Sequence, residues 1–199
     1  MNVPLAALLA TALLAGSDDD VVKRLHVRFA PYDIIVASCR DVVAREPEPG
    51  SATFHYSFDV SDEHWLGPRR RTGKLTFWLD DIVIRSPRTI SWPGMTDADR
   101  ERAATLRRTV EHHEIGHVRV AEAVRDALNA QEPIIAPDLA AFAAAAEARG
   151  RLGFERFTRE ERAYDALTDH GRKQHAAPGE LRGPDSALFC PVPERVREG

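Results

Sequence analysis

The chain has 199 residues, of which 43% are hydrophobic and 29% are charged. This length and composition predict one globular domain with a sizeable core. A formal net charge of -4 excludes a general nucleic-acid-binding protein, which would carry a clear basic excess. The run Arg69-Arg70-Arg71 lies between the turn residues Gly67-Pro68 and Thr72-Gly73, so we interpret it as a solvated turn between strands.

The chain starts with an apolar run, Val3–Ala15, that is too short to span a bilayer as an ordinary helix. Small residues follow it and would permit cleavage, so we predict a signal peptide over residues 1–17 and a secreted or periplasmic protein. No stable membrane insertion is expected after its removal. A buried N-terminal helix is the alternative, because no Lys or Arg precedes the run. Export would allow Cys39 and Cys190 to form a disulfide, whereas cytosolic cysteines would be separate thiols.

The first half of the chain has hydrophobic residues with a period of two, which predicts half-buried strands. The strongest alternation covers Thr53–Val60 and Lys74–Leu79. Shorter predicted strands are Leu25–Ala30, Asp33–Ala37, Asp81–Arg85 and Thr89–Trp92. Turn residues separate these segments, so we predict a mostly antiparallel N-terminal sheet.

The period changes after Pro93-Gly94, where Thr96 and Asp99 have the spacing of a capping box. Apolar residues then recur at helical spacing and predict a helix that ends near Ala130. A second helix is predicted from Pro137-Asp138 to about His170, with Gly171 as its C-cap. Gly150 and Gly153 are positions where an interruption or a bend is expected. The predicted class is α+β: a sheet followed by two long helices.

The first predicted helix contains the pattern H-E-x-x-H at residues 113–117. Because His113 and His117 are four residues apart, both imidazoles lie on one face and can reach a single zinc ion. Glu114 is placed beside that metal, where it can take a proton from a zinc-activated water and pass it to the leaving amine. The alternative is a pair of core histidines satisfied by hydrogen bonds, with Glu114 as a surface charge.

A catalytic zinc site needs a third protein ligand and an open fourth position. The segment Tyr164–Gly171 offers two residues for that role. On helical geometry we favour Asp165 as the third ligand, with His170 donating a hydrogen bond to the developing oxyanion. In the alternative, His170 binds the metal and Asp165 orients one of its ligands. The hydroxyl of Tyr164 is a second candidate for stabilising the tetrahedral intermediate.

Together, H-E-x-x-H and a later Y-D-x-x-T-x-H-G motif resemble a bacterial family of predicted secreted zinc-dependent proteases, formerly a domain of unknown function. That family belongs to the zincin-like metallopeptidases. The resemblance extends over Asp33–Gln174, and its second motif is the more specific one. The matching residues are His113, Glu114, His117, Tyr164, Asp165, Thr168, His170 and Gly171. It implies a zincin-like fold, a zinc cofactor and a peptidase activity.

We therefore predict a zinc-dependent metallopeptidase, a hydrolase that acts on a peptide or protein substrate. A strand of the N-terminal sheet would align that substrate by main-chain pairing. The alternative is a non-catalytic module on the same fold, which binds zinc structurally or binds a cell-envelope partner. In this interpretation, residues 18–176 form the zincin-like domain and residues 177–199 form a loop-rich tail.

Overall fold

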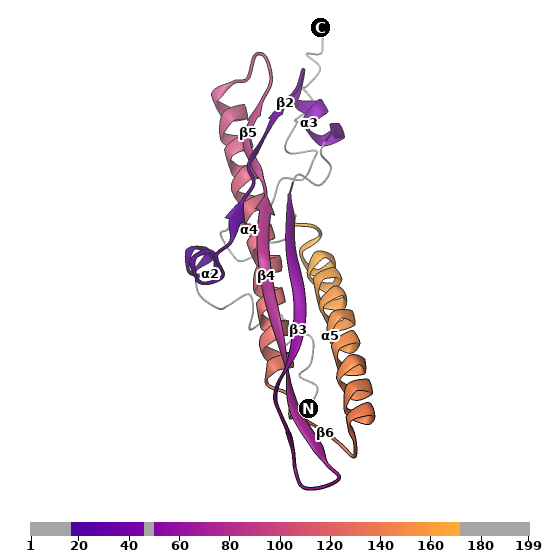
Figure 1. Cartoon of the computed structure of the whole chain (residues 1–199). Coiled ribbons are helices and arrows are strands. Elements are labelled where there is room, and N and C mark those ends of the chain that lie inside the picture. Colours follow the sequence, from indigo (N-terminus) through magenta and orange to yellow (C-terminus); the bar gives the residue numbers. More distant parts are fainter. Residues whose placement is uncertain (1–16, 46–49, 172–199) are drawn as a thin grey trace, which may run out of the picture. The chain divides into compact units, whose positions relative to one another are not determined.

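The structure is a computed structural model that describes residues 17–45 and 50–171. Its elements, most of which are labelled in Figure 1, confirm the α+β class, with strands mostly before two long helices. They are α2 (Asp18–Arg24), β1 (Arg28–Phe29), β2 (Tyr32–Ile35), α3 (Cys39–Arg45), β3 (Ser51–Trp65), β4 (Arg71–Arg85), β5 (Pro87–Ser91), α4 (Asp97–Asn129), β6 (Ile134–Ala136) and α5 (Leu139–Thr168). Residues 1–16 of the predicted signal peptide, and the predicted tail, lie outside the described residues.

The main sheet has the strand order β1-β4-β3, and β6 pairs with the first residues of β4 in antiparallel register. The two segments predicted as separate strands, Lys74–Leu79 and Asp81–Arg85, form the single strand β4. Asp81 takes a φ of 49° inside that strand. Aspartate tolerates this left-handed conformation better than most residues. The point where the alternation of apolar and polar residues is interrupted is therefore a local irregularity, and the strand continues through it.

A second, two-stranded sheet joins β2 to β5. These strands are parallel, with Ile34 opposite Ile90 and Ile35 opposite Ser91. The long connection between parallel strands contains α3 and the β3–β4 pair. The described strands thus include a parallel pair, β2–β5, as well as an antiparallel pair, β4–β6, so their orientations are mixed.

The strand predicted over Leu25–Ala30 is wrong in its first residues. The residues before it form helix α2, and Leu25 is the C-cap of that helix. A capping box explains this helix, because Ser17 accepts from the backbone of Asp20 and the Asp20 side chain accepts from the backbone of Ser17. Only Arg28–Phe29 of the predicted strand pairs in the sheet.

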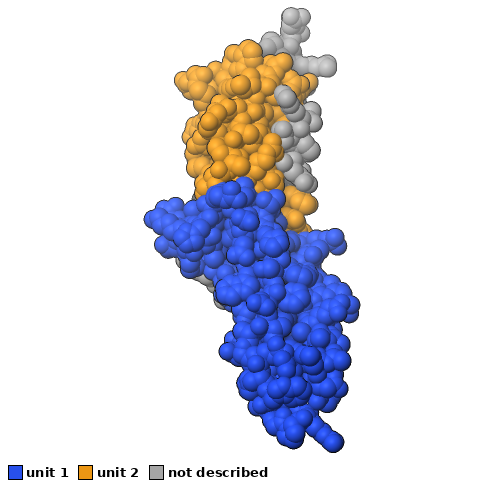
Figure 2. All heavy atoms as spheres, viewed as in Figure 1, with its two compact units in different colours: residues 1–28, 52–83, 115–164 blue, residues 29–51, 84–114, 165–199 orange. Residues whose placement is uncertain are grey.

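The chain divides into two compact units, which Figure 2 distinguishes by colour. The boundaries after Glu114 and after Tyr164 lie within α4 and α5. Unit 1 comprises residues 1–28, 52–83 and 115–164. Its core joins side chains from β4, β6 and both long helices, with partly buried residues of β3 packed against them. The buried members are Leu75, Phe77, Val120, Val124, Leu128, Ile134, Ala136, Phe142, Ala146, Phe157 and Tyr164.

The side chain of Asn129 fastens the end of α4 to β4 in unit 1. Its Oδ1 accepts from the Phe77 backbone N–H at 2.7 Å, and its Nδ2 donates to the Phe77 carbonyl at 3.0 Å. One side chain therefore satisfies both polar backbone groups of a buried strand residue. This anchor sets where the second half of α4 lies along the strand.

Unit 2 comprises residues 29–51, 84–114 and 165–199. Its core contains Ile34 and Ile90 of the parallel strands, Val42 of α3 and Ala103 of α4. Cys39 packs against this core and is disulfide-bonded, while the chain's other cysteine, Cys190, lies outside the described residues.

Both long helices form where the sequence predicts them. Thr96 and Asp99 complete the capping box before α4, with reciprocal bonds of 2.8 and 3.2 Å. Gly150 and Gly153 do not interrupt α5. Among the residues the structure describes, no helix is long and apolar enough to cross a membrane.

Candidate metal centre

The middle of α4 carries the H-E-x-x-H residues inside the protein. His113, Glu114 and His117 are all buried, as are the apolar residues around them. The continuous helix places the two imidazoles one turn apart on the same side. Glu114 is therefore not a surface charge, which removes one part of the non-metal interpretation.

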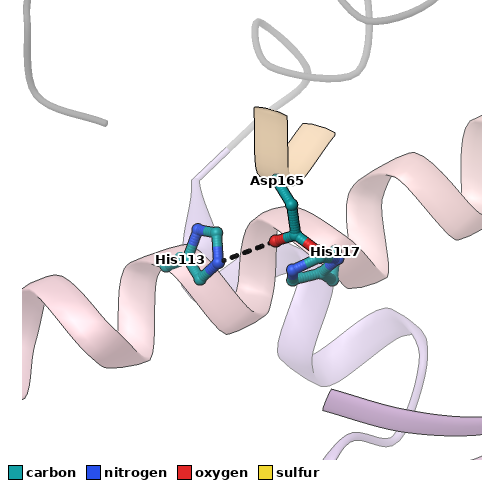
Figure 3. Close-up of side chains that lie close together, drawn as sticks. All are labelled: His113, His117 and Asp165. Atoms are coloured by element: carbon teal, nitrogen blue, oxygen red, sulfur yellow. Dashed lines mark ion pairs between the residues drawn. The ribbon is translucent and has the colours of Figure 1, made fainter. Parts of the chain in front are cut away.

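Asp165, near the end of α5, completes a group of three potential ligands with His113 and His117. One ligand atom from each residue lies within 4.8 Å of those of the other two. Figure 3 shows the three side chains turned toward one another, with Nε2 of His113 3.4 Å from Oδ1 of Asp165. Two imidazole nitrogens and a carboxylate oxygen at this separation form a candidate metal site.

Glu161 contacts the same site and was not predicted from the sequence. Its Oε2 lies 2.6 Å from Nδ1 of His117. Glu161 is four residues before Asp165, just as His113 is four residues before His117, so each histidine faces one carboxylate of α5. That i,i+4 spacing of two acids on one helix face is the signal that could have identified it.

Tyr56 of β3 lies close enough to Glu161 for the charge of that carboxylate to affect the Tyr56 hydroxyl. Burial is the main cause that raises the pKa of the Tyr56 hydroxyl, and the Glu161 carboxylate raises it further. The ring stacks on Phe157, one turn before Glu161 on α5, with centroids 3.5 Å apart. The Tyr56 hydroxyl next to Glu161 therefore stays protonated.

Tyr164, predicted to stabilise a reaction intermediate, is fully buried. Its ring meets the imidazole of His117 edge-on, with centroids 4.8 Å apart. Together with Glu161, this packing restricts the orientation of the His117 ring. The structure thus places Tyr164 against a potential ligand.

His170 lies just beyond α5 and is not a member of the three-residue group. Its side chain is 56% exposed, and its Nδ1 is 3.7 Å from Oδ1 of Asp165. The helix ends with positive φ angles at Asp169, His170 and Gly171. The prediction of Gly171 as the C-cap was wrong, because α5 ends at Thr168 and Asp169 is the first residue with a positive φ. Gly171 lies against the ring of His113, where a Cβ would be 3.2 Å from Cγ of that ring.

Glu114 has a close backbone neighbour in Gly50, the residue before β3. A Cβ on Gly50 would overlap Oε1 of Glu114 and would lie 2.6 Å from Cγ1 of Val110. Only a glycine permits this approach, which brings the start of β3 next to the carboxylate. Gly50 was not singled out in the sequence, because no local pattern distinguishes a glycine that packs against a distant helix.

The donor set fits zinc. Zinc in proteins binds imidazole nitrogen and carboxylate oxygen, and catalytic sites use three protein ligands with one position open. The contact between Glu161 and Nδ1 of His117 adds the outer partner that metal-binding histidines usually have. His113, His117 and Asp165 are the residues that would hold the ion.

One family model matches the chain over residues 42–171, and its description is "Bacterial protein of unknown function (DUF922)". The matched region contains the whole candidate metal centre, including Glu114 and Glu161. Among curated proteins and solved structures, none matches this chain.

Proposed function

The chain belongs to the bacterial family DUF922, whose function is unknown, and we propose that it is a zinc-dependent peptidase. The observation that carries this proposal is the group of the buried His113 and His117 with the half-buried Asp165, with Glu114 between the two histidines in sequence. A structural zinc site prefers four protein ligands, whereas within the part of the chain that the structure describes this group offers three. That difference favours catalysis over a purely structural role.

The proposed chemistry divides among the residues of the centre. Zinc bound by His113, His117 and Asp165 would activate a water molecule and polarise the peptide carbonyl. Glu114 accepts the proton of that water and passes it to the leaving amine. The exposed imidazole of His170, next to Asp165, donates a hydrogen bond to the oxygen on which negative charge develops.

Strand β3 is the proposed guide for an extended substrate. Among the described strands, only β4 pairs with it, so its other edge is available for main-chain hydrogen bonds. Gly50 precedes that strand and contacts Glu114, so an aligned peptide would lead toward the general base. This alignment places the scissile bond by backbone pairing and does not require a particular side chain.

Metal content tests the first part of the proposal. Elemental analysis of the wild type should find about one zinc per chain, which Asp165→Ala and His117→Ala should lose. Asp169→Ala is the matched control, because it removes a neighbouring carboxylate outside the group. Retention of zinc in Asp165→Ala and loss in His170→Ala would make His170 the third ligand. No zinc in the wild type after reconstitution would overturn the proposal.

Hydrolysis tests the second part. Glu114→Gln should keep zinc and lower the cleavage rate of an unfolded protein substrate by about 10²–10⁴-fold, the range for loss of a general base. Full activity in that variant would contradict the role of Glu114. A wild type that binds zinc but cleaves neither unfolded proteins nor peptide libraries would support the non-catalytic zinc-binding module.

A further inference from the structure

The end of β3 and the turn that follows it form the longest continuous exposed segment in the described part of unit 1. All ten residues from Ser61 to Arg70 are exposed; we call them the hairpin tip. The connection between α4 and α5 pairs with β4 at Arg71–Gly73 through β6. Figure 1 shows the tip lying beyond this pairing, so neither long helix covers it.

The hairpin tip presents two adjacent large apolar side chains. Trp65 is 51% exposed and Leu66 is 45% exposed. Single exposed apolar residues are common on proteins, but an adjacent pair where β3 ends and the turn begins is a contact surface that a partner can cover. Leu66 donates its backbone N–H to the Arg70 carbonyl at 2.6 Å, so the turn that carries the pair is a closed one.

Two arginines, Arg69 and Arg70, follow the apolar pair after Gly67 and Pro68. Among the described residues, no acidic side chain forms an ion pair with Arg69 or Arg70. Arg71 pairs with Glu63 and lies over the ring of Trp65, 5.1 Å from its centroid. The tip itself has two arginines, Arg69 and Arg70, and two carboxylates, Asp62 and Glu63, but Glu63 is paired with Arg71 just outside the tip. The two arginines are therefore balanced by only one remaining carboxylate, in a chain whose net charge is -4.

We propose that the hairpin tip docks on an anionic phospholipid surface. Tryptophan suits the boundary between headgroups and acyl chains, because its ring is apolar and its N–H stays hydrated. Leu66 enters the same boundary, while Arg69 and Arg70 bind lipid phosphates. An acidic polymer in water would satisfy the arginines but would leave Trp65 and Leu66 exposed, so the observations favour a membrane surface.

Sedimentation with vesicles tests this docking on the full chain. Binding is expected to equimolar phosphatidylglycerol and phosphatidylcholine and to be much weaker with phosphatidylcholine alone. Replacing both Arg69 and Arg70 by Gln should lower the partition coefficient by about 25-fold, or about fivefold per arginine. The double variant Trp65→Ala and Leu66→Ala should lower it by about tenfold or more.

Trp78 provides the matched control, since it is 52% exposed but lies outside the tip. Trp78→Ala should bind vesicles like the wild type, and thermal unfolding checks that every variant folds. Brominated lipids add a test in conservative variants. Quenching of tryptophan fluorescence should persist in Trp78→Phe and should disappear in Trp65→Phe.

Two results would overturn the proposal. One is equal binding to neutral and anionic vesicles, or none to either. The other is arginine-dependent binding that survives the loss of Trp65 and Leu66, which would identify a general polyanion contact. These assays contain no peptide substrate and need no zinc, so their outcome is independent of the proposed peptidase function.

Discussion

Nδ1 of His117 and Oε2 of Glu161 lie 2.6 Å apart, so a carboxylate of α5 directly contacts a potential metal ligand of α4. A carboxylate at this position accepts the Nδ1 proton, so the ring keeps the lone pair of Nε2 for a metal. Tyr164 packs against the same ring. His117 is therefore oriented by its protein surroundings.

Removal of the Glu161 carboxylate should weaken metal binding. We expect Glu161→Ala to lower zinc affinity by about 10–100-fold, the usual effect of losing such an outer partner. Glu161→Gln should have a smaller effect, because its amide oxygen still accepts the Nδ1 proton. Competition with a chromophoric chelator measures both affinities.

Glu160 provides the control for this substitution. It is the neighbouring residue on α5 and is also buried, but its ion pair is with Arg159. Glu160→Gln should leave zinc affinity unchanged, whatever it does to stability. If Glu161→Ala binds zinc as tightly as the wild type, His117 does not depend on Glu161 for its orientation.

Gly50 should matter for turnover. An alanine there would overlap the Glu114 carboxylate and crowd Val110, so Glu114 must move. A displacement of about 1 Å in a catalytic group can cost about 10²-fold in rate. We expect Gly50→Ala to retain zinc and fold but to lose at least tenfold in kcat, measured by peptide cleavage together with elemental analysis.

Gly150→Ala is the matched control, since a Cβ at Gly150 would crowd Phe58, far along the chain from Glu114. It should lower stability without changing kcat per folded, zinc-loaded molecule. Equal turnover in Gly50→Ala and the wild type would show that Glu114 is not held by this contact.

Acid should weaken the start of α4. Hydrogen bonds from Thr96 are the main cause that lowers the pKa of Asp99, with Arg102 contributing less. A carboxyl whose folded pKa is lowered stabilises the fold above its ordinary pKa, and this contribution is lost as pH falls through the folded value. Asp99→Asn should thus be less stable than the wild type near pH 7. The gap in urea unfolding midpoint should close at about pH 3 or below. A gap that is independent of pH would contradict this ionic cap.

Both long helices and the H-E-x-x-H residues could be predicted because their signals are local. The capping box at Thr96 and the helical spacing of apolar residues depend on neighbours along one helix. His113 and His117 share a face for the same reason. Asp165 lies beside them, as the favoured interpretation expected, but that proximity depends on how α5 packs against α4.

Other parts of the site depend on packing alone. Gly50 has its role only because β3 starts beside Glu114. The short strand β6 was not predicted, because three residues are too few for a period to show. Helix α3 was missed for a similar reason, since its seven residues make only two turns. The interruption expected at Gly150 and Gly153 was wrong, because α5 continues through both glycines. Each glycine allows a phenylalanine ring to approach the helix closely.

Gly153 shows how packing overrides local preference. Alanine is favoured over glycine inside a helix by about 1 kcal/mol, so Gly153→Ala would stabilise an isolated α5. In the folded chain, a Cβ at this position would lie 2.6 Å from Cζ of Phe77, a fully buried residue of the unit 1 core. Overpacking of this kind costs about 1–3 kcal/mol. We therefore expect Gly153→Ala to lower the free energy of unfolding, measured by urea denaturation.

The double variant Gly153→Ala and Phe77→Leu should recover part of that loss relative to Phe77→Leu alone, because the shorter side chain leaves room for the methyl group. If Gly153→Ala is instead more stable than the wild type, α5 does not pack this closely on β4.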